Sequence, residues 1–255
     1  MNRAEPNLAV RPTSFSKIAH LREAFRQSFE CQFVRDSILS RGLATPYIVT
    51  RDATVVGYAG VWSKHFPDRI MEFYVDPMSD HLSTEIFYRL ITSSRATSIE
   101  AQTNIPKMYE LARAFCRNLE DEKLLFESRK RESTSLDEME FRARAESDES
   151  EVEGEWVVVE KDQVVAAGGV LTHYNPPYAD IYMEVRKSKR RRGIGSFLVQ
   201  ELCRVCTENG LYASARCDAD NIASQNTLLR GGMTICGRLV SGQIANLYLV
   251  ERSTA

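Results

Sequence analysis

The stretch that decides the fold is ADIYMEVRKSKRRRGIGSFLVQEL, residues 179–202. Its first seven residues alternate between apolar and polar types and predict a strand that ends at Val185. Six of the next seven residues are basic, and Gly193, Ile194 and Gly195 then open an amphipathic helix. The stretch therefore predicts a strand, a basic glycine-containing turn and a helix in direct succession.

This turn has the properties of an anion site. Glycines let the backbone approach a bulky anion, and a helix N-terminus offers unpaired N–H groups with a partial positive charge. The helix dipole contributes only about 0.3–1 kcal/mol, so convergent N–H bonds and nearby Arg or Lys side chains must supply the rest. The stretch predicts a diphosphate cradle. It is not a P-loop, because the pattern G-x-x-x-x-G-K-[ST] is not present. It is not a dinucleotide fingerprint either, because Leu198 stands where the third glycine of G-x-G-x-x-G belongs.

A second motif follows downstream, with Asn221 and Ser224 three residues apart and Arg230, Gly232 and Met233 after them. Together with R-x-x-G-x-G at residues 190–195, it resembles the two coenzyme A motifs of the GNAT superfamily of N-acetyltransferases. The resemblance implies an α/β fold with a mixed sheet, the GNAT acyl-CoA N-acyltransferase fold. It also implies acetyl-CoA as co-substrate and an amine as acceptor.

In that family the backbone amides of the glycine turn bind the pyrophosphate, here residues 191–196, and the pantetheine arm lies along the preceding strand. The resemblance therefore assigns donor binding to Met183, Val185, Arg190, Arg191, Arg192, Gly193, Ile194, Gly195, Ser196, Asn221 and Ser224. Two alternatives stay open. The basic run also fits a solvated charged face or a nucleic-acid patch, although no aromatic residues for base stacking stand beside it. Asn221 also fits a plain helix N-cap.

The catalytic residues are less clear than the donor site. An amine must arrive unprotonated, and a carboxylate usually takes its proton. Asp180 and Glu184 are the candidates on this strand. Asp180 stands one residue from the position of the glutamate that some members carry, and a one-residue slip reverses the face unless a bulge corrects it. Either carboxylate equally fits a solvent-facing position. Leu228 stands where the family has a tyrosine, which leaves Ser224 or Asn226 to supply a hydrogen bond to the thiolate, or water to protonate it.

The chain also contains an internal repeat. Residues 47–61 and 156–170 align without a gap, and in both places a hairpin, a strand, a helix, a strand and a helix follow in order. This predicts two GNAT-like domains in tandem, spanning residues 1–130 and 131–255. The segment 123–130 fits either the end of the first copy or the start of the second.

Three further segments complete the prediction. Residues 16–42 form a long helical segment in the first copy only. Residues 135–145 form a short helix, and the acidic run 146–155 forms a solvated loop.

The first copy lacks the anion motif. Counted from the end of the third strand, the positions of Arg190, Gly193 and Gly195 hold Asp80, Ser83 and Glu85. Carboxylates repel a diphosphate. The first domain is therefore expected to bind no coenzyme A, and to pack against the second and help to shape the acceptor site.

Composition limits the remaining functions. The hydrophobic fraction is 43% and the net charge −2, which favours a globular protein without general attraction to nucleic acid or membrane. No apolar signal segment is present, so a cytoplasmic location is expected. Six scattered cysteines predict neither disulfides nor a metal site. The expected partner is a small-molecule or peptide amine, and the oligomeric state is open, a homodimer included. The alternative function is a non-catalytic acyl-CoA sensor or interaction module on the same scaffold.

Overall fold

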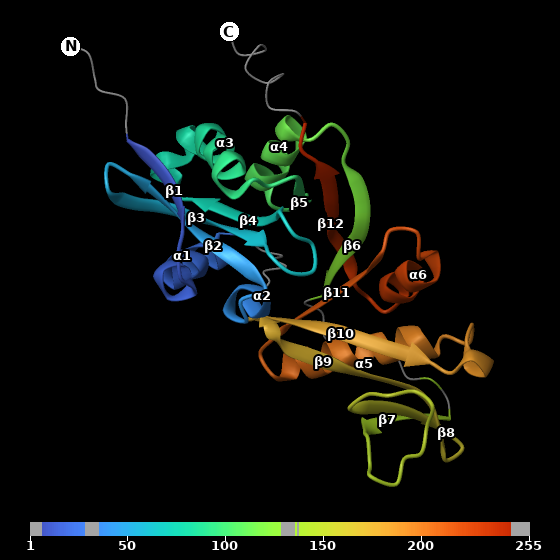
Figure 1. The fold of residues 1–255 in the computed structure, drawn as a ribbon. Helices are drawn as coiled ribbons and strands as arrows, with labels where there is room; N and C mark the ends of the chain where they lie inside the picture. Colours follow the sequence, from blue (N-terminus) through green and yellow to red (C-terminus); the bar gives the residue numbers. More distant parts are fainter. Residues whose placement is uncertain (1–6, 29–35, 129–135, 137, 246–255) are drawn as a thin grey trace. The chain divides into compact units, whose positions relative to one another are not determined.

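The computed structural model describes residues 7–28, 36–128, 136 and 138–245 (Figure 1). The chain divides into two compact units. Unit 1 comprises Met1–Glu122 and Arg238–Ala255, and unit 2 comprises Lys123–Gly237. The boundary predicted near residue 130 falls outside the described residues.

Unit 1 contains a mixed sheet in which each strand lies antiparallel to its neighbour except for one parallel pair, β4 with β5. The strands, in spatial order, are β1 (Leu8–Pro12), β2 (Ala44–Arg51), β3 (Thr54–Trp62), β4 (Arg69–Val75), β5 (Ser98–Gln102) and β12 (Thr234–Gln243).

Unit 2 repeats this pattern, again with one parallel pair, β10 with β11. Its strands, given in the order that corresponds to the strands of unit 1, are β7 (Met139–Ala143), β8 (Trp156–Glu160), β9 (Gln163–Asn175), β10 (Tyr178–Val185), β11 (Tyr212–Asp218) and β6 (Glu120–Ser128). The two hairpins aligned in sequence, β2–β3 and β8–β9, occupy equivalent positions. The predicted tandem fold is thus confirmed.

The last strand of each copy is exchanged between the units. β6 closes the first copy in sequence, but its residues Lys123–Ser128 pair with β11 in unit 2. β12 closes the second copy, but its residues Leu239–Gln243 pair with β5 in unit 1. Exchange of equivalent elements is familiar between separate protomers, and here it occurs within one chain. It explains why the segment 123–130 fitted both copies equally well.

The predicted helices are present except for the one at 135–145. Unit 1 contains α1 (Phe15–Gln27), α2 (Asp36–Ser40), η1 (Pro77–Leu82), α3 (Ser83–Ser94) and α4 (Pro106–Phe115), and unit 2 contains η2 (Lys187–Lys189), α5 (Ile194–Glu208) and α6 (Ile222–Arg230). The helical segment predicted over 16–42 corresponds to α1 and α2, with 29–35 outside the described residues. No helix in the described part of the chain is long and apolar enough to cross a membrane.

One predicted element is wrong. Within the short helix predicted at 135–145, Met139–Ala143 form the edge strand β7, which pairs with β8. The ring of Phe141 stacks on that of Trp156, with 5.0 Å between their centroids. Cross-strand pairing of this kind stabilises a strand more than local helix propensity opposes it. The following acidic segment has no helix or strand, as predicted, but Val152 within it is buried.

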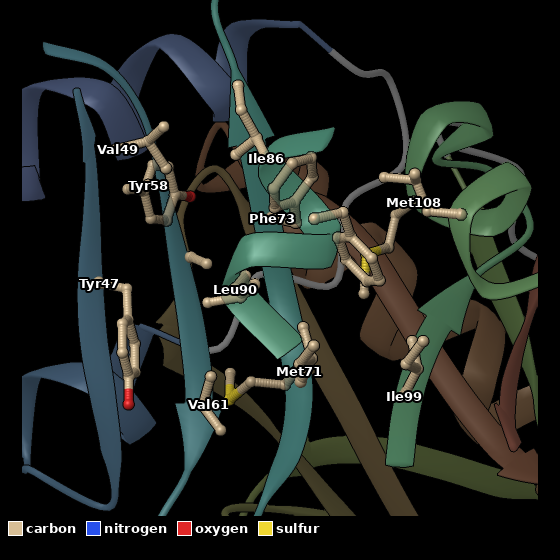
Figure 2. Close-up of a cluster of buried hydrophobic side chains, with 14 of the residues drawn as sticks. Tyr47, Val49, Tyr58, Val61, Met71, Phe73, Ile86, Leu90, Ile99 and Met108 are labelled. Carbon is tan, nitrogen blue, oxygen red and sulfur yellow. The ribbon is translucent and has the colours of Figure 1, made fainter. Parts of the chain in front are cut away.

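Helices cover both faces of the unit 1 sheet. Phe87 of α3 packs edge-on against Phe73 of β4. Phe25 of α1 packs edge-on against Tyr58 of β3, which faces the other side of the sheet. Figure 2 shows Phe73 and Tyr58 among the buried side chains of this unit. In unit 2, α5 packs against β9, β10 and β11. The described residues of unit 2 include no counterpart of α1. The face of β10 that carries Tyr182 and Glu184 is therefore more open than the equivalent face in unit 1.

A buried ionic cluster ties α1 to the unit 1 sheet. The Arg22 guanidinium donates to both carboxylate oxygens of Glu72 at 2.8 and 3.1 Å, and the Tyr58 hydroxyl donates to the same carboxylate at 2.6 Å. Arg22 is only 1% exposed. Burial and the nearby Glu72 raise the pKa of the Tyr58 hydroxyl, which therefore stays protonated.

Arg22→Met is expected to reduce the free energy of unfolding by about 3–5 kcal/mol, because it leaves the buried Glu72 charge without its cation. Lys107→Met serves as the control, since its half-exposed pair with Asp80 should contribute less than about 1 kcal/mol. Urea denaturation of both variants measures the difference. Equal losses would contradict a structural role for the buried cluster.

Candidate functional site

An open groove of about 1300 Å³ lies in unit 2 where β10, the following basic turn and two helix N-termini meet. Its lining contains ten of the eleven residues predicted to bind the donor. The groove residues are Met183, Glu184, Val185, Lys187, Ser188, Lys189, Arg190, Arg191, Gly193, Ile194, Gly195, Ser196, Asn221, Ala223, Ser224, Asn226, Thr227 and Arg230. Arg192 is the predicted residue that does not line it.

The N-terminus of α5 faces this groove. The first hydrogen bond of the helix runs from the Phe197 N–H to the Gly193 carbonyl at 3.0 Å. The N–H groups of Ile194, Gly195 and Ser196 therefore precede the intrahelical ladder. No side chain of the described residues caps this end. These amides, reinforced by the helix dipole, can hold an anion.

Gly193 and Gly195 are required for different physical reasons. Gly193 has a φ of +82°, a left-handed conformation that a Cβ disfavours. A Cβ at Gly195 would lie 3.0 Å from the Thr227 methyl carbon, so the glycine permits close approach of α5 and α6. The groove depends on both, because the first orients the helix entrance and the second sets the spacing of its walls.

The basic residues of the turn divide into two groups. Lys187, Arg190 and Arg191 are exposed at the groove. Arg190 donates from Nε to the Val185 carbonyl at 3.1 Å and stands 3.8 Å from Glu184. The predicted ligand Arg192 is engaged elsewhere, since its guanidinium contacts Glu160 at 2.5 and 3.1 Å.

The N-terminus of α6 forms a second wall. The Asn221 side chain accepts a hydrogen bond from the Ser224 N–H at 3.0 Å, so Asn221 does act as an N-cap. Both residues also line the groove. Thr227 was not singled out by sequence, because a helix residue gives no sign of what its neighbouring helix leaves open.

The strands that flank the groove separate. β10 pairs with β11 only from Tyr178 to Asp180, although both strands continue beyond this point. In the described part of unit 2, the edge of residues 181–185 that faces away from β9 has no strand partner. An extended ligand can therefore add along this edge by main-chain hydrogen bonds, with Met183 and Val185 in reach.

The two candidate bases occupy different environments. Asp180 is buried where the strands separate, accepts a hydrogen bond from Ser214 at 2.9 Å and stands 3.6 Å from Arg216. It does not line the groove. Glu184 lines the groove and its side chain is 59% exposed. The irregularity in register places extra residues on β9 opposite Ala179, so the alternation of β10 continues and both carboxylates share a face.

A comparison with family models finds one match. The family model described as Acetyltransferase (GNAT) family matches residues 107–232. This part of the chain is therefore similar to the GNAT acetyltransferases. No curated protein matches the sequence.

Solved GNAT structures share the fold. The chain is similar to an acetyltransferase of the GNAT family from Colwellia psychrerythraea, with TM-score 0.74, 17% identity, and 93% of this chain and 100% of that chain covered. It is also similar to a GCN5-related N-acetyltransferase from Sphaerobacter thermophilus, with TM-score 0.56, 14% identity, and 92% and 95% covered. A tandem GNAT protein from the clavulanic acid biosynthesis pathway aligns with TM-score 0.57, 10% identity, and 94% and 99% covered. At these identities the likeness shows the fold.

The corresponding turn of unit 1 is occupied by its own carboxylates. Asp76 accepts hydrogen bonds from the N–H groups of Met78 and Ser79 at 2.9 and 3.1 Å. Asp80 accepts a hydrogen bond from the Ser83 hydroxyl and pairs with Lys107 at 3.1 Å. Protein oxygens thus occupy amides that an incoming phosphate would need, and their charge opposes an anion.

Other chemistry finds less support in the described residues. The Leu228 side chain, at the position of the family tyrosine, is buried in the core between α6 and the sheet. Cys203 and Cys206 are buried in α5, and burial raises the pKa of their thiols to about 11 and about 12. A reactive or metal-binding cysteine pair needs the opposite shift. Among the described residues, no group of three or more His, Cys, Asp or Glu side chains is arranged for a metal.

Proposed function

We propose that unit 2 binds acetyl-CoA in its groove and catalyses transfer of the acetyl group to an amine of a small molecule or peptide. The observation that carries this proposal is the glycine turn whose free helix amides open into a basic groove beside an unpaired strand edge. The match of residues 107–232 to the GNAT family supports acyl transfer in general. The acetyl donor and the amine acceptor are the finer parts of the proposal.

The groove has the features that coenzyme A requires. The amides that begin α5 and the side chains of Arg190, Arg191 and Lys187 would hold the pyrophosphate. At Gly195 a side chain would press against the groove residues Thr227, Val185 and Met183, so the glycine keeps this part of the groove free. The free edge of β10 would receive the pantetheine arm, with Met183 and Val185 as main-chain partners. The donor brings an acetyl thioester whose carbonyl carbon is open to attack.

Glu184 is the base in this proposal. It lines the groove and is open to solvent, so it can take the proton of an incoming ammonium and release it to water. The amine nitrogen forms the new C–N bond as the C–S bond breaks. A backbone N–H near Val185 would polarise the carbonyl oxygen. Asp180 is held by Ser214 and Arg216, which suits a structural role at the point where β10 and β11 separate.

The groove residues include no tyrosine that could protonate the leaving thiolate, and the position of the family tyrosine holds the buried Leu228. Ser224 and Asn226 line the groove and can donate a hydrogen bond. A thiol of pKa about 8.5 also leaves as the anion without full protonation. The absence of the tyrosine is the observation that favours the second candidate function, a sensor that binds acyl-CoA without turnover.

Thiol release separates the two functions. Purified protein with acetyl-CoA and a panel of amines (polyamines, aminoglycosides, amino acids and lysine peptides) is expected to release free thiol with one class and to give its acetylated product by mass spectrometry. Acetyl-CoA that binds but yields no thiol with any amine would contradict the enzyme and support the sensor.

Gly193→Val is expected to weaken coenzyme A binding at least tenfold in calorimetry, because the side chain strains the left-handed turn and enters the groove. Gly210→Val is the matched control. Gly210 follows the other end of α5 with a φ of +72° and equally open space, so the backbone strain is similar but lies away from the groove. Equal affinities for the two variants would contradict an anion site at the α5 N-terminus.

Glu184→Gln is expected to lower kcat by about 10²-fold with little change in the KM for acetyl-CoA, since a general base contributes about that factor. Raising the pH should recover part of the rate, because more of the amine is then unprotonated in solution. Asp180→Asn should have the smaller effect. The reverse ranking of the two variants would assign the base to Asp180.

A further inference from the structure

Glu160 holds the basic turn from outside the groove. It ends β8, is 7% exposed and is not among the groove residues. Lys189 donates to its Oε2 at 2.6 Å, and the Arg192 guanidinium spans both oxygens at 2.5 and 3.1 Å. Hydrogen bonds from Arg192 and Lys189 hold the pKa of this carboxyl at about 2, so it is charged at any working pH.

The two cations stand on either side of a strained residue. Arg191 has a φ of +62°, in the left-handed region that a residue with a Cβ rarely occupies. Such a conformation persists only where the surroundings impose it. Lys189 and Arg192, two residues before and one residue after Arg191, are both fixed to the one carboxylate. Glu160 therefore constrains the chain on both sides of the strain.

The strain determines the direction of the turn. Arg191 and Gly193 are both left-handed, and both line the groove, while Arg192 between them points to Glu160. Successive N–H groups in a turn of this kind form a concave surface that binds anions. If Arg191 relaxed, the amides of the turn would no longer converge on the groove.

We infer that Glu160 is a positioning residue for donor binding, anchoring Lys189 and Arg192 so that the amides of residues 191–196 are preset for a diphosphate. This inference rests on the proposed function, because the diphosphate is that of coenzyme A. Glu160 touches no ligand in this arrangement and acts through the turn.

A competing explanation predicts the opposite sign. If Glu160 only neutralised excess positive charge, its removal would leave the groove more positive and tighten the binding of an anion. If Glu160 positions the turn, its removal must weaken binding although the site gains net positive charge. The direction of the change in affinity therefore separates the two roles.

The test is a calorimetric titration of coenzyme A into the full chain and into Glu160→Gln. The variant is expected to bind about tenfold more weakly, the factor by which the left-handed conformation is disfavoured in a residue with a Cβ. Glu138→Gln is the matched control. Glu138 is exposed, pairs with Lys161 and contributes to the field at Arg192, but has no bond to the turn, so its variant should bind within twofold of the wild type.

A second variant reports on the strain itself. Arg191→Gly adopts the left-handed conformation without penalty. In that background, Glu160→Gln should weaken binding less than threefold, against tenfold in the parent chain. A residue that served only general stability would produce the same loss in both backgrounds.

Two measurements keep the inference testable if Glu160→Gln does not fold. Arg192→Gln, which removes one exposed partner, should weaken binding in the same direction. Amide hydrogen exchange of residues 190–196 in the ligand-free chain should be faster in either variant. Unchanged or tighter binding by a folded Glu160→Gln overturns the inference alone. A wild type that binds no coenzyme A overturns the proposed donor, and unchanged exchange in the variants then overturns the clamp as well.

Discussion

The proposed anion site depends on a few backbone N–H groups at the start of α5 that precede the hydrogen bonds of the helix. A helix must begin with amides outside its own hydrogen-bond ladder, and α5 begins with them at a left-handed glycine, beside the groove. Gly193 orients these amides, and Lys187, Arg190 and Arg191 surround them with positive charge. Gly195 brings α6 close, and the separation of β10 from β11 opens a path beside them.

The two copies show how one fold supports opposite chemistry. Both units have the same strand order and a single parallel pair, so the position of the turn is the same in each. In unit 2 the turn presents open amides and cations. In unit 1, Asp76 takes two of the turn's amides, and Asp80 places a second carboxylate nearby. A few side chains, with no change of topology, separate an anion site from one that an anion would avoid.

Sequence reasoning predicted what local patterns determine and missed what long-range pairing determines. The repeated hairpin pattern predicted the tandem fold, and the two motifs predicted ten donor-binding residues that line the groove. Both predictions rest on short stretches of consecutive residues. The exchange of β6 and β12 could not be predicted, since the pairing partner of a strand is not determined by its own residues. β7 was mistaken for a helix because its pairing with β8 lies outside its own sequence. Glu160 was not singled out from the sequence, since only the folded chain brings it to Lys189 and Arg192.

The most direct test of the central claim is the amide hydrogen-exchange footprint of coenzyme A on the full chain. The account predicts slowed exchange at residues 191–196 of unit 2 and no change at residues 76–85, the corresponding turn of unit 1. Protection confined to unit 1, or binding that leaves the amides at the start of α5 exchanging as before, would contradict it.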